Sequence, residues 1–204
     1  IQNIKVNHFL SLHKRHNRCL QLLSSLESED VYNIAQEQYK DSITMTDRIV
    51  TFDILENSSD ELSSFTQKDF YAKYKNDSLT MNKYFSIVAS SKRAGLLQRV
   101  ISLQDDSAYD EKVPNLVRSL IGSFTRNYNN FHAKDGSGYK FVADKIIEID
   151  TINAQMAAGL AGAFKIYEKM NAINKNAMKK ELERVASTQT LSKNVYEIIS
   201  KILK

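Results

Sequence analysis

The chain contains few of the residues that interrupt helices or cross-link a fold. Among its 204 residues there are one proline, six glycines, one cysteine and no tryptophan. An all-β fold needs many tight turns, which favour glycine and proline, so this composition argues against that class. The single cysteine, Cys19, excludes an internal disulfide and is typical of a reducing compartment, from which we predict a cytoplasmic protein.

Long hydrophobic runs are also missing. No segment approaches the ~18 apolar residues of a membrane helix, and no signal-peptide pattern opens the chain, so we expect no membrane partner. The net charge of +4 arises mainly from scattered lysines and arginines. Nucleic-acid-binding proteins more often carry a dense basic stripe interleaved with aromatic residues, so we expect no nucleic-acid partner either.

The length of the chain permits a sizeable hydrophobic core, and no low-complexity linker divides it. We therefore predict a single helical domain over residues 1–204. The sequence opens on Ile1 rather than on methionine, which suggests a piece of a longer polypeptide.

What the chain does contain is helical periodicity. Apolar residues recur every three or four positions along most of its length, and no segment alternates convincingly as a strand does. The connections are short, so neighbouring helices should be antiparallel, as in an α-solenoid or a compact helical layer; no internal repeat confirms a regular solenoid. The predicted helices lie near residues 4–12, 15–27, 30–39, 44–57, 60–75, 80–90, 93–104, 114–126, 138–150, 152–169, 175–187 and 192–203.

The densest set of specific residues lies between Val113 and Tyr139. Pro114 precedes an apolar-periodic run and suits a first helical position, because it has no N–H to leave unpaired there. The asparagines at 127, 129 and 130 are predicted to end this helix. The Asp-Gly-Ser-Gly sequence at 135–138 predicts a turn, since glycine takes positive φ at little cost. The segment is therefore predicted to form a helix, a turn and a second helix.

The same segment resembles a known pattern. P-N-x-V-R-S-L-I-G-x-F at 114–124 and F-H-A-x-D-G-S-G-Y at 131–139 are similar to the C-terminal domain of bacterial aminopeptidase N, the gluzincin family of alanyl aminopeptidases. The resemblance extends from about Lys14 to Lys204. Its further matches are M-T-D at 45–47, the stretches 70–74 and 81–85, N-A-Q-M-A at 153–157, and the closing stretch 191–198.

This resemblance implies both a fold and a role. The implied fold is all-α, a superhelix of paired antiparallel helices of armadillo or HEAT character, an α-solenoid. The implied role is that of the C-terminal cap domain of a larger aminopeptidase, which removes N-terminal residues from peptides. The domain would cover the catalytic domain of the same polypeptide, enclose the active site in a chamber, restrict the access of substrate and contact the C-terminal part of the peptide.

The catalytic motifs of that family are missing from this chain. Zinc binding there needs H-E-x-x-H on a helix, where two histidines ligate the metal and the glutamate acts on the attacking water. The histidines here are His8, His13, His16 and His132; none is followed by glutamate, and the exopeptidase motif G-x-M-E-N is also missing. We therefore predict no catalytic residue, metal ligand or cofactor in this chain, zinc elsewhere in the parent enzyme, and no hydrolysis by the chain alone.

Arg118 is the first candidate for contact with a peptide substrate. In the family the arginine of R-S-L-I-G faces the internal chamber, and Arg118 occupies that position here. Its planar fork suits a carboxylate or peptide carbonyls through paired hydrogen bonds. A surface arginine or a structural salt bridge is the simpler alternative.

Gln155 and Gly159 are the other candidates, both on the predicted helix 152–169. They lie four residues apart, beside a predicted apolar stripe, on the face that meets substrate in the family. The family carries arginine where this chain has Gly159, so we expect a weaker preference for a free C-terminal carboxylate unless another cation replaces the lost one. Alternatively, the small residues at 157–163 form a close helix-packing surface. The predicted stripe comprises Ile152, Met156, Leu160, Ala163 and Tyr167.

Two other patterns have simpler explanations than a site. His13, His16 and Cys19 are spaced by three residues, but on a helix the third position has rotated well away from the first, so a solvated basic face with a buried Cys19 is expected. The 135–138 turn lacks the G-K-[ST] ending of a phosphate-binding loop, and His132 beside it is predicted to make a helix-end hydrogen bond.

A stand-alone helical-repeat scaffold, which would bind a partner protein in a concave groove, is the alternative function. The composition permits it equally well, and only the motif resemblance favours the aminopeptidase domain.

Overall fold

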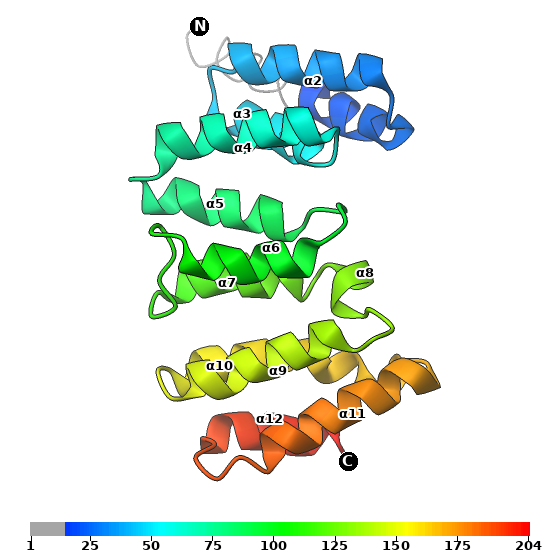
Figure 1. The fold of residues 1–204 in the computed structure, drawn as a ribbon, viewed down its shortest axis with the longest axis vertical. Helices are drawn as coiled ribbons and strands as arrows, with labels where there is room; N and C mark the ends of the chain where they lie inside the picture. Colours follow the sequence, from blue (N-terminus) through cyan, green and yellow to red (C-terminus); the bar gives the residue numbers. More distant parts are fainter. Residues whose placement is uncertain (1–14) are drawn as a thin grey trace, which may run out of the picture. The chain divides into compact units, whose positions relative to one another are not determined.

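The computed structural model describes residues 15–204, and within that range every regular element is a helix and no strand is present (Figure 1). The all-α prediction is confirmed. The predicted helix at 4–12 lies outside the described residues. The chain separates into two compact units, Ile1–Ser91 and Lys92–Lys204. The single domain over 1–204 stays a prediction.

The first unit is a succession of helices that pack in chain order. Helix α2 (Glu29–Asp41) packs on α3 (Met45–Glu56), and α3 packs on α4 (Asp60–Tyr74). Helix α5 (Ser78–Ala89) packs on both α3 and α4. Four side chains start these helices by accepting a backbone N–H, the usual role of a helix-capping Ser, Thr or Asp: Ser28, Thr44, Ser59 and Asp77. The elements after a helical stretch at 15–23 are η1 (Ser24–Leu26), α2 (Glu29–Asp41), α3 (Met45–Glu56), α4 (Asp60–Tyr74) and α5 (Ser78–Ala89).

The core of this unit is aromatic. Phe52 on α3, Phe70 on α4 and Phe85 on α5 are fully buried, and Tyr84 is nearly so. The ring centres of Phe52 and Phe70 lie 4.9 Å apart and those of Phe52 and Tyr84 5.9 Å apart, within the range of favourable ring contacts. These contacts join three consecutive helices.

The second unit is built around α9, which contacts both α10 and α11, while α12 closes on α10. The apolar faces of two helices are buried: Leu120 and Phe124 on α7, and Tyr139 and Ile146 on α9. The elements are α6 (Leu96–Ser102), η2 (Leu103–Asp105), α7 (Pro114–Phe124), α8 (Tyr128–Phe131), α9 (Ser137–Asp150), α10 (Ala154–Ala161), η3 (Gly162–Lys169), α11 (Ala172–Ala186) and α12 (Lys193–Ile202).

Two local predictions differ from the structure. Asn127 does follow the end of α7, but its side chain also accepts the N–H of Asn130 and so begins α8, a single turn that was not predicted. The continuous helix predicted over 152–169 starts at Ala154 and changes after Ala161 into the 3₁₀ helix η3. Ile152 precedes the helix and is 39% exposed, so it does not belong to the buried stripe.

Gly136 and Gly138 give the 135–138 turn its form. Gly136 has a φ of 73°, in the left-handed region that favours glycine, and it immediately precedes α9. A Cβ at Gly138 would lie 2.5 Å from the carbonyl oxygen of Phe131 and 2.6 Å from that of Asn130, so only glycine fits there. The turn therefore allows the first residues of α9 to pack against the backbone of α8.

Around this approach lies a second aromatic cluster. The ring of Phe131 on α8 stands edge-on to Tyr139 at 5.2 Å and to Phe164 at 5.6 Å, and it also contacts Phe124. The four side chains are almost fully buried. They tie α7, α8, α9 and η3 into one core.

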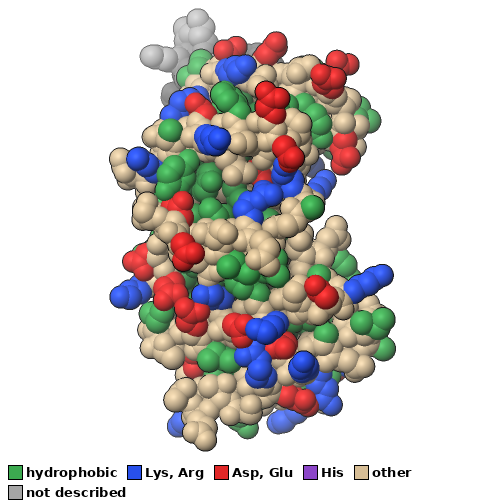
Figure 2. Space-filling view, in the orientation of Figure 1, with side chains coloured by type: hydrophobic (Ala, Val, Ile, Leu, Met, Phe, Trp, Pro, Cys, Tyr) green, Lys and Arg blue, Asp and Glu red, His purple; other side chains and the backbone are tan. Residues whose placement is uncertain are grey.

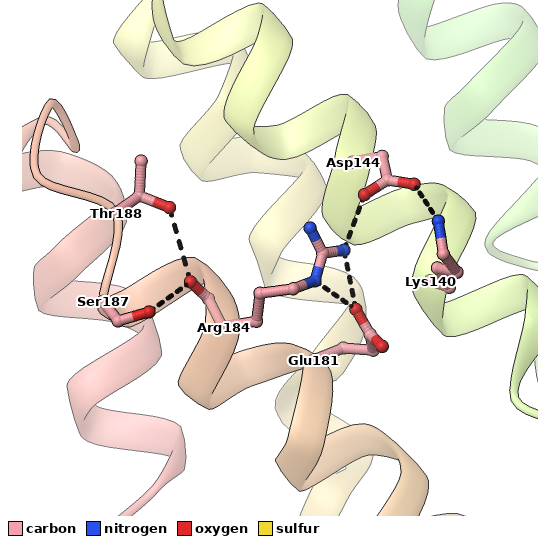
Figure 3. A network of polar contacts seen from close by, with 6 residues as sticks. All are labelled: Lys140, Asp144, Glu181, Arg184, Ser187 and Thr188. Atoms are coloured by element: carbon pink, nitrogen blue, oxygen red, sulfur yellow. Dashed lines mark hydrogen bonds and ion pairs between the residues drawn. The ribbon is translucent and has the colours of Figure 1, made fainter.

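A polar network joins the outer faces of α9 and α11 (Figure 3). Arg184 on α11 forms ion pairs at 2.6 Å with Asp144 on α9 and with Glu181 one turn earlier on its own helix, and Lys140 bonds the other oxygen of Asp144. Burial acts to raise the pKa of Asp144, but the hydrogen bonds from Lys140 and Arg184 outweigh it, and the pKa lies below its usual value. Elsewhere, acidic and basic side chains are interspersed over the face that Figure 2 shows.

We predict that Gly138→Ala destabilises the chain by about 1–3 kcal/mol, because the added methyl overpacks the contact between α9 and α8. Thermal or urea unfolding of the two proteins measures the difference. Gly162→Ala is the matched control: a Cβ there meets nothing within 4 Å, so it should be neutral or stabilising by up to about 1 kcal/mol. A Gly138→Ala protein as stable as the parent would contradict this account of the turn.

Candidate functional site

A groove of about 560 Å³ runs between α7 and α10, within the second unit. One wall carries Arg118, Gly122 and Arg126, and the other carries Gln155, Gly159 and Ala163. Val117, Met156 and Leu160 contribute apolar surface. The three residues predicted to meet substrate thus line the same groove.

The α7 wall follows from the amphipathic pattern of that helix. Leu116, Val117, Leu120 and Ile121 are buried on one side, which leaves Arg118 exposed on the other. Pro114 occupies the first turn, where its missing N–H costs nothing. The burial of the apolar side thus fixes which way the basic side faces.

Arg118 is held but not neutralised. One of its guanidinium nitrogens, Nη1, donates to the side-chain oxygen of Asn115 at 2.8 Å, and within residues 15–204 it has no ion pair. Because an arginine carries five N–H donors, most of its capacity is left for a ligand. Of the two simpler alternatives for Arg118, the structural salt bridge is not formed in the described part of the chain, whereas the side chain is exposed, as that of a surface arginine would be.

The α10 wall begins with a cap. The side chain of Asn153 accepts the backbone N–H groups of Gln155 at 3.1 Å and of Met156 at 3.0 Å, which fixes the first turn of α10. Gln155 is exposed on that turn and lines the groove. Its amide offers both donors and an acceptor, a set that suits a peptide backbone.

Gly159 lies one turn further along the same wall, and nothing stands within 4 Å of the position where a Cβ would be. The same holds at Gly162. These two glycines therefore serve no close helix contact, which argues against the packing-surface alternative at their positions. The side of α10 and η3 that is buried consists instead of Ala157, Leu160, Ala161, Phe164 and Tyr167.

Arg126 is the groove residue that the sequence reasoning missed. It follows α7 in the turn, where its Nη2 donates to Ser123 Oγ at 2.9 Å. Successive members of the set Arg118, Gly122 and Arg126 lie four residues apart, the spacing that would place their side chains on one face of the helix predicted over 114–126. That spacing was the available signal for Arg126 in the sequence, but the asparagines that follow indicated only the end of a helix.

The groove is basic. Two arginines line it and no aspartate or glutamate does, so its local charge is positive although the whole chain is only mildly basic. An anionic or carbonyl-rich ligand therefore fits its chemistry best.

The residues considered for metal binding are not gathered into a site. His16 is exposed, His13 lies outside the described residues, and Cys19 is exposed rather than buried because Asn17 and Leu20 occupy the inward positions of that helix. Among residues 15–204 no three His, Cys, Asp or Glu side chains are grouped so that they could hold a metal ion. The described residues do not fit a zinc site.

His132 makes a local hydrogen bond, as predicted, although its partner is a side chain. Its Nδ1 lies 2.8 Å from the hydroxyl oxygen of Tyr139 on α9. Burial lowers the pKa of His132 and raises the pKa of Tyr139 to about 12, so a neutral ring faces a neutral phenol at pH 7. The pair helps to hold α8 against α9.

In the part of the chain that the structure describes, no helix has both the length and the apolar character needed to cross a lipid bilayer.

Comparison with known proteins gives a consistent result. A family model described as "Domain of unknown function (DUF3458_C) ARM repeats" matches residues 12–204. The chain belongs to this family. Its ARM-repeat description confirms the predicted armadillo-like solenoid of paired helices.

Relatives of this DUF3458_C domain are longer proteins named aminopeptidase N. The chain is 30% identical to that of Haemophilus influenzae over 196 residues, which cover 96% of the chain and 22% of the relative. It is 28% identical to that of Escherichia coli over 92% of the chain and 22% of the relative. The chain thus spans less than a quarter of the curated relatives it matches. The resemblance to an aminopeptidase N domain is confirmed.

A solved structure shares the fold of this DUF3458_C domain. It is that of Legionella pneumophila aminopeptidase A in complex with aspartic acid, which matches with a TM-score of 0.87 and 29% identity. The match covers 94% of the chain and 23% of that structure's chain.

We predict that His132 contributes to the pH dependence of stability. Because its pKa in the folded chain lies below the ordinary value of 6.5, the unfolded chain binds more protons, and the free energy of unfolding falls as the pH drops from about 7 to about 5. His132→Asn should flatten this part of the curve. Urea unfolding at several pH values measures it, and the comparison with the parent chain cancels the other histidines. An unchanged slope would contradict the assignment.

Proposed function

We propose that this chain is the C-terminal, non-catalytic domain of a zinc-dependent aminopeptidase. It would cover the active-site chamber of the same polypeptide, limit access to short or unfolded peptides, and hold the C-terminal part of the peptide in the groove between α7 and α10. The observation that carries the proposal is the convergence of Arg118, Gln155 and Gly159 on one basic groove in a family member whose relatives are named aminopeptidases.

Each groove residue has a definite part in this proposal. Arg118 binds the C-terminal carboxylate through its planar fork, and the low competition from neighbouring carboxylates leaves that fork available. Gln155 bonds the peptide backbone. Gly159 leaves room for the chain of the ligand, since it places no side chain in the groove.

The chemistry of hydrolysis lies outside this chain. The described residues offer no metal site, so zinc, its ligands and the acid–base groups would belong to other parts of the longer polypeptide. The contribution of this domain is enclosure and positioning, which reduce the freedom of the bound peptide before reaction.

We predict that the chain alone does not hydrolyse alanine p-nitroanilide or tripeptides, because it lacks both catalytic motifs. The longer protein from the same open reading frame should cleave both. Release of p-nitroaniline and of free amino acid measures the two activities. Turnover by the chain that persists through chromatography and chelator treatment would contradict the proposal. A reading frame without G-x-M-E-N and H-E-x-x-H upstream would favour the stand-alone scaffold.

We predict that Arg118→Ala in the longer protein raises KM for a tripeptide with a free C-terminus by about tenfold, since a charge-assisted contact is lost. KM for the amidated tripeptide and kcat for alanine p-nitroanilide should stay near their parent values. Lys180→Ala, which removes an exposed charge that does not line the groove, is the matched control. Equal losses on the acid and the amide would contradict a carboxylate contact.

A further inference from the structure

The groove contains a cation that the proposed function does not use. Arg126 lines the same wall as Arg118, eight residues further along, and its guanidinium donates only to Ser123 Oγ among residues 15–204. Other arginines of the second unit are engaged differently: Arg184, for example, is paired with two carboxylates. Arg126 is therefore a basic side chain placed at a groove with no internal acidic partner.

The residue between the two arginines keeps the space above the helix open. Gly122 stands four residues from each and contributes no side chain to the wall. A Cβ at Gly122 would meet the side chain of Arg118 at 3.6 Å, an ordinary contact, so a small residue could be accommodated; a longer one would extend into the gap between the arginines. On the opposite wall Gly159 has no side chain and Ala163 has only a methyl group.

The separation of the two arginines sets the size of a suitable ligand. From Arg118 to Phe124 the helix rises by roughly 9 Å, and two residues of the following turn extend the separation to Arg126 to roughly 10–12 Å. An extended peptide covers that distance in about three to four residues, at about 3.3 Å each. Two cations at this interval match a peptide that carries two carboxylates three or so residues apart.

We propose that Arg126 is a second anion-binding residue of the groove, and that the chain prefers peptides with a C-terminal carboxylate on Arg118 and an acidic side chain, three residues upstream, on Arg126. The assignment of Arg118 rests on the proposed function; that of Arg126 rests on the groove itself. Arg126 thereby supplies, from the α7 wall, a positive charge in place of the arginine that the family carries at the position of Gly159. Because Arg118 and Arg126 can each bind one carboxylate, the groove prefers peptides with two.

The test is direct binding to the 204-residue chain by isothermal titration calorimetry. Four acetylated pentapeptides serve as probes: ADAAA and ANAAA, each as the free acid and as the C-terminal amide. The parent chain should bind the ADAAA acid about tenfold more tightly than either peptide with a single charge. This preference should shrink as salt is raised, because exposed charges are screened.

Variants separate the two contacts. Arg126→Gln should abolish the preference for ADAAA over ANAAA and keep the preference for acid over amide, whereas Arg118→Gln should do the reverse. Arg126→Lys keeps the charge without the fork and should retain part of the preference, and Lys180→Gln should retain all of it. Both arginines are exposed, so all variants should fold with the helix content of the parent, as far-UV circular dichroism shows.

The outcomes are distinct. Three results would overturn the proposal. The aspartate preference could survive Arg126→Gln, the parent chain could show no aspartate preference, or the parent chain could bind none of the four peptides. If Arg118→Gln leaves the acid preference intact while Arg126→Gln abolishes the aspartate preference, the proposed role of Arg118 fails and that of Arg126 stands.

Discussion

The close approach of α9 to α8 is the constraint on which the second unit depends. It is possible only because position 138 has no side chain, and it brings Tyr139 against Phe131 and His132. Once α9 is fixed in this way, it provides the surface against which α10 and α11 pack. The position of the groove wall on α10 thus depends on the backbone packing of α9 as well as on the groove residues themselves.

Most of the helices could be predicted because their apolar residues repeat over three or more turns. The features that were missed lack such a repeat. The single turn of α8 is too short to show a period, and the change from α10 to η3 at Gly162 depends on hydrogen bonding that small residues do not reveal. Cys19 was expected to be buried, but the side of its helix that faces inward carries Asn17 and Leu20 instead. Asn17 reaches Asp47 on α3, and a polar contact of that kind has no apolar signal.

Part of the candidate site could also be predicted, from motif resemblance rather than from periodicity. Arg118, Gln155 and Gly159 came from a motif resemblance, and the structure brings them to one groove. Their spacing alone could not have done so, because residues 118 and 155 belong to helices that are joined only through tertiary packing. Arg126 was within reach of periodicity, but its importance is visible only when the opposite wall is known to carry no acidic residue.

The empty space beside Gly159 has a consequence for how the groove can change over time. Most substitutions in a folded domain lose some stability, and a new function must be reached without falling below the stability that folding requires. At Gly159 the main chain is already helical, no neighbour is close, and any other ordinary residue should favour the helix more than glycine does. A side chain can therefore be added to this wall of the groove by a single substitution at no expected cost to the fold, so the lining of the groove is open to change at this position.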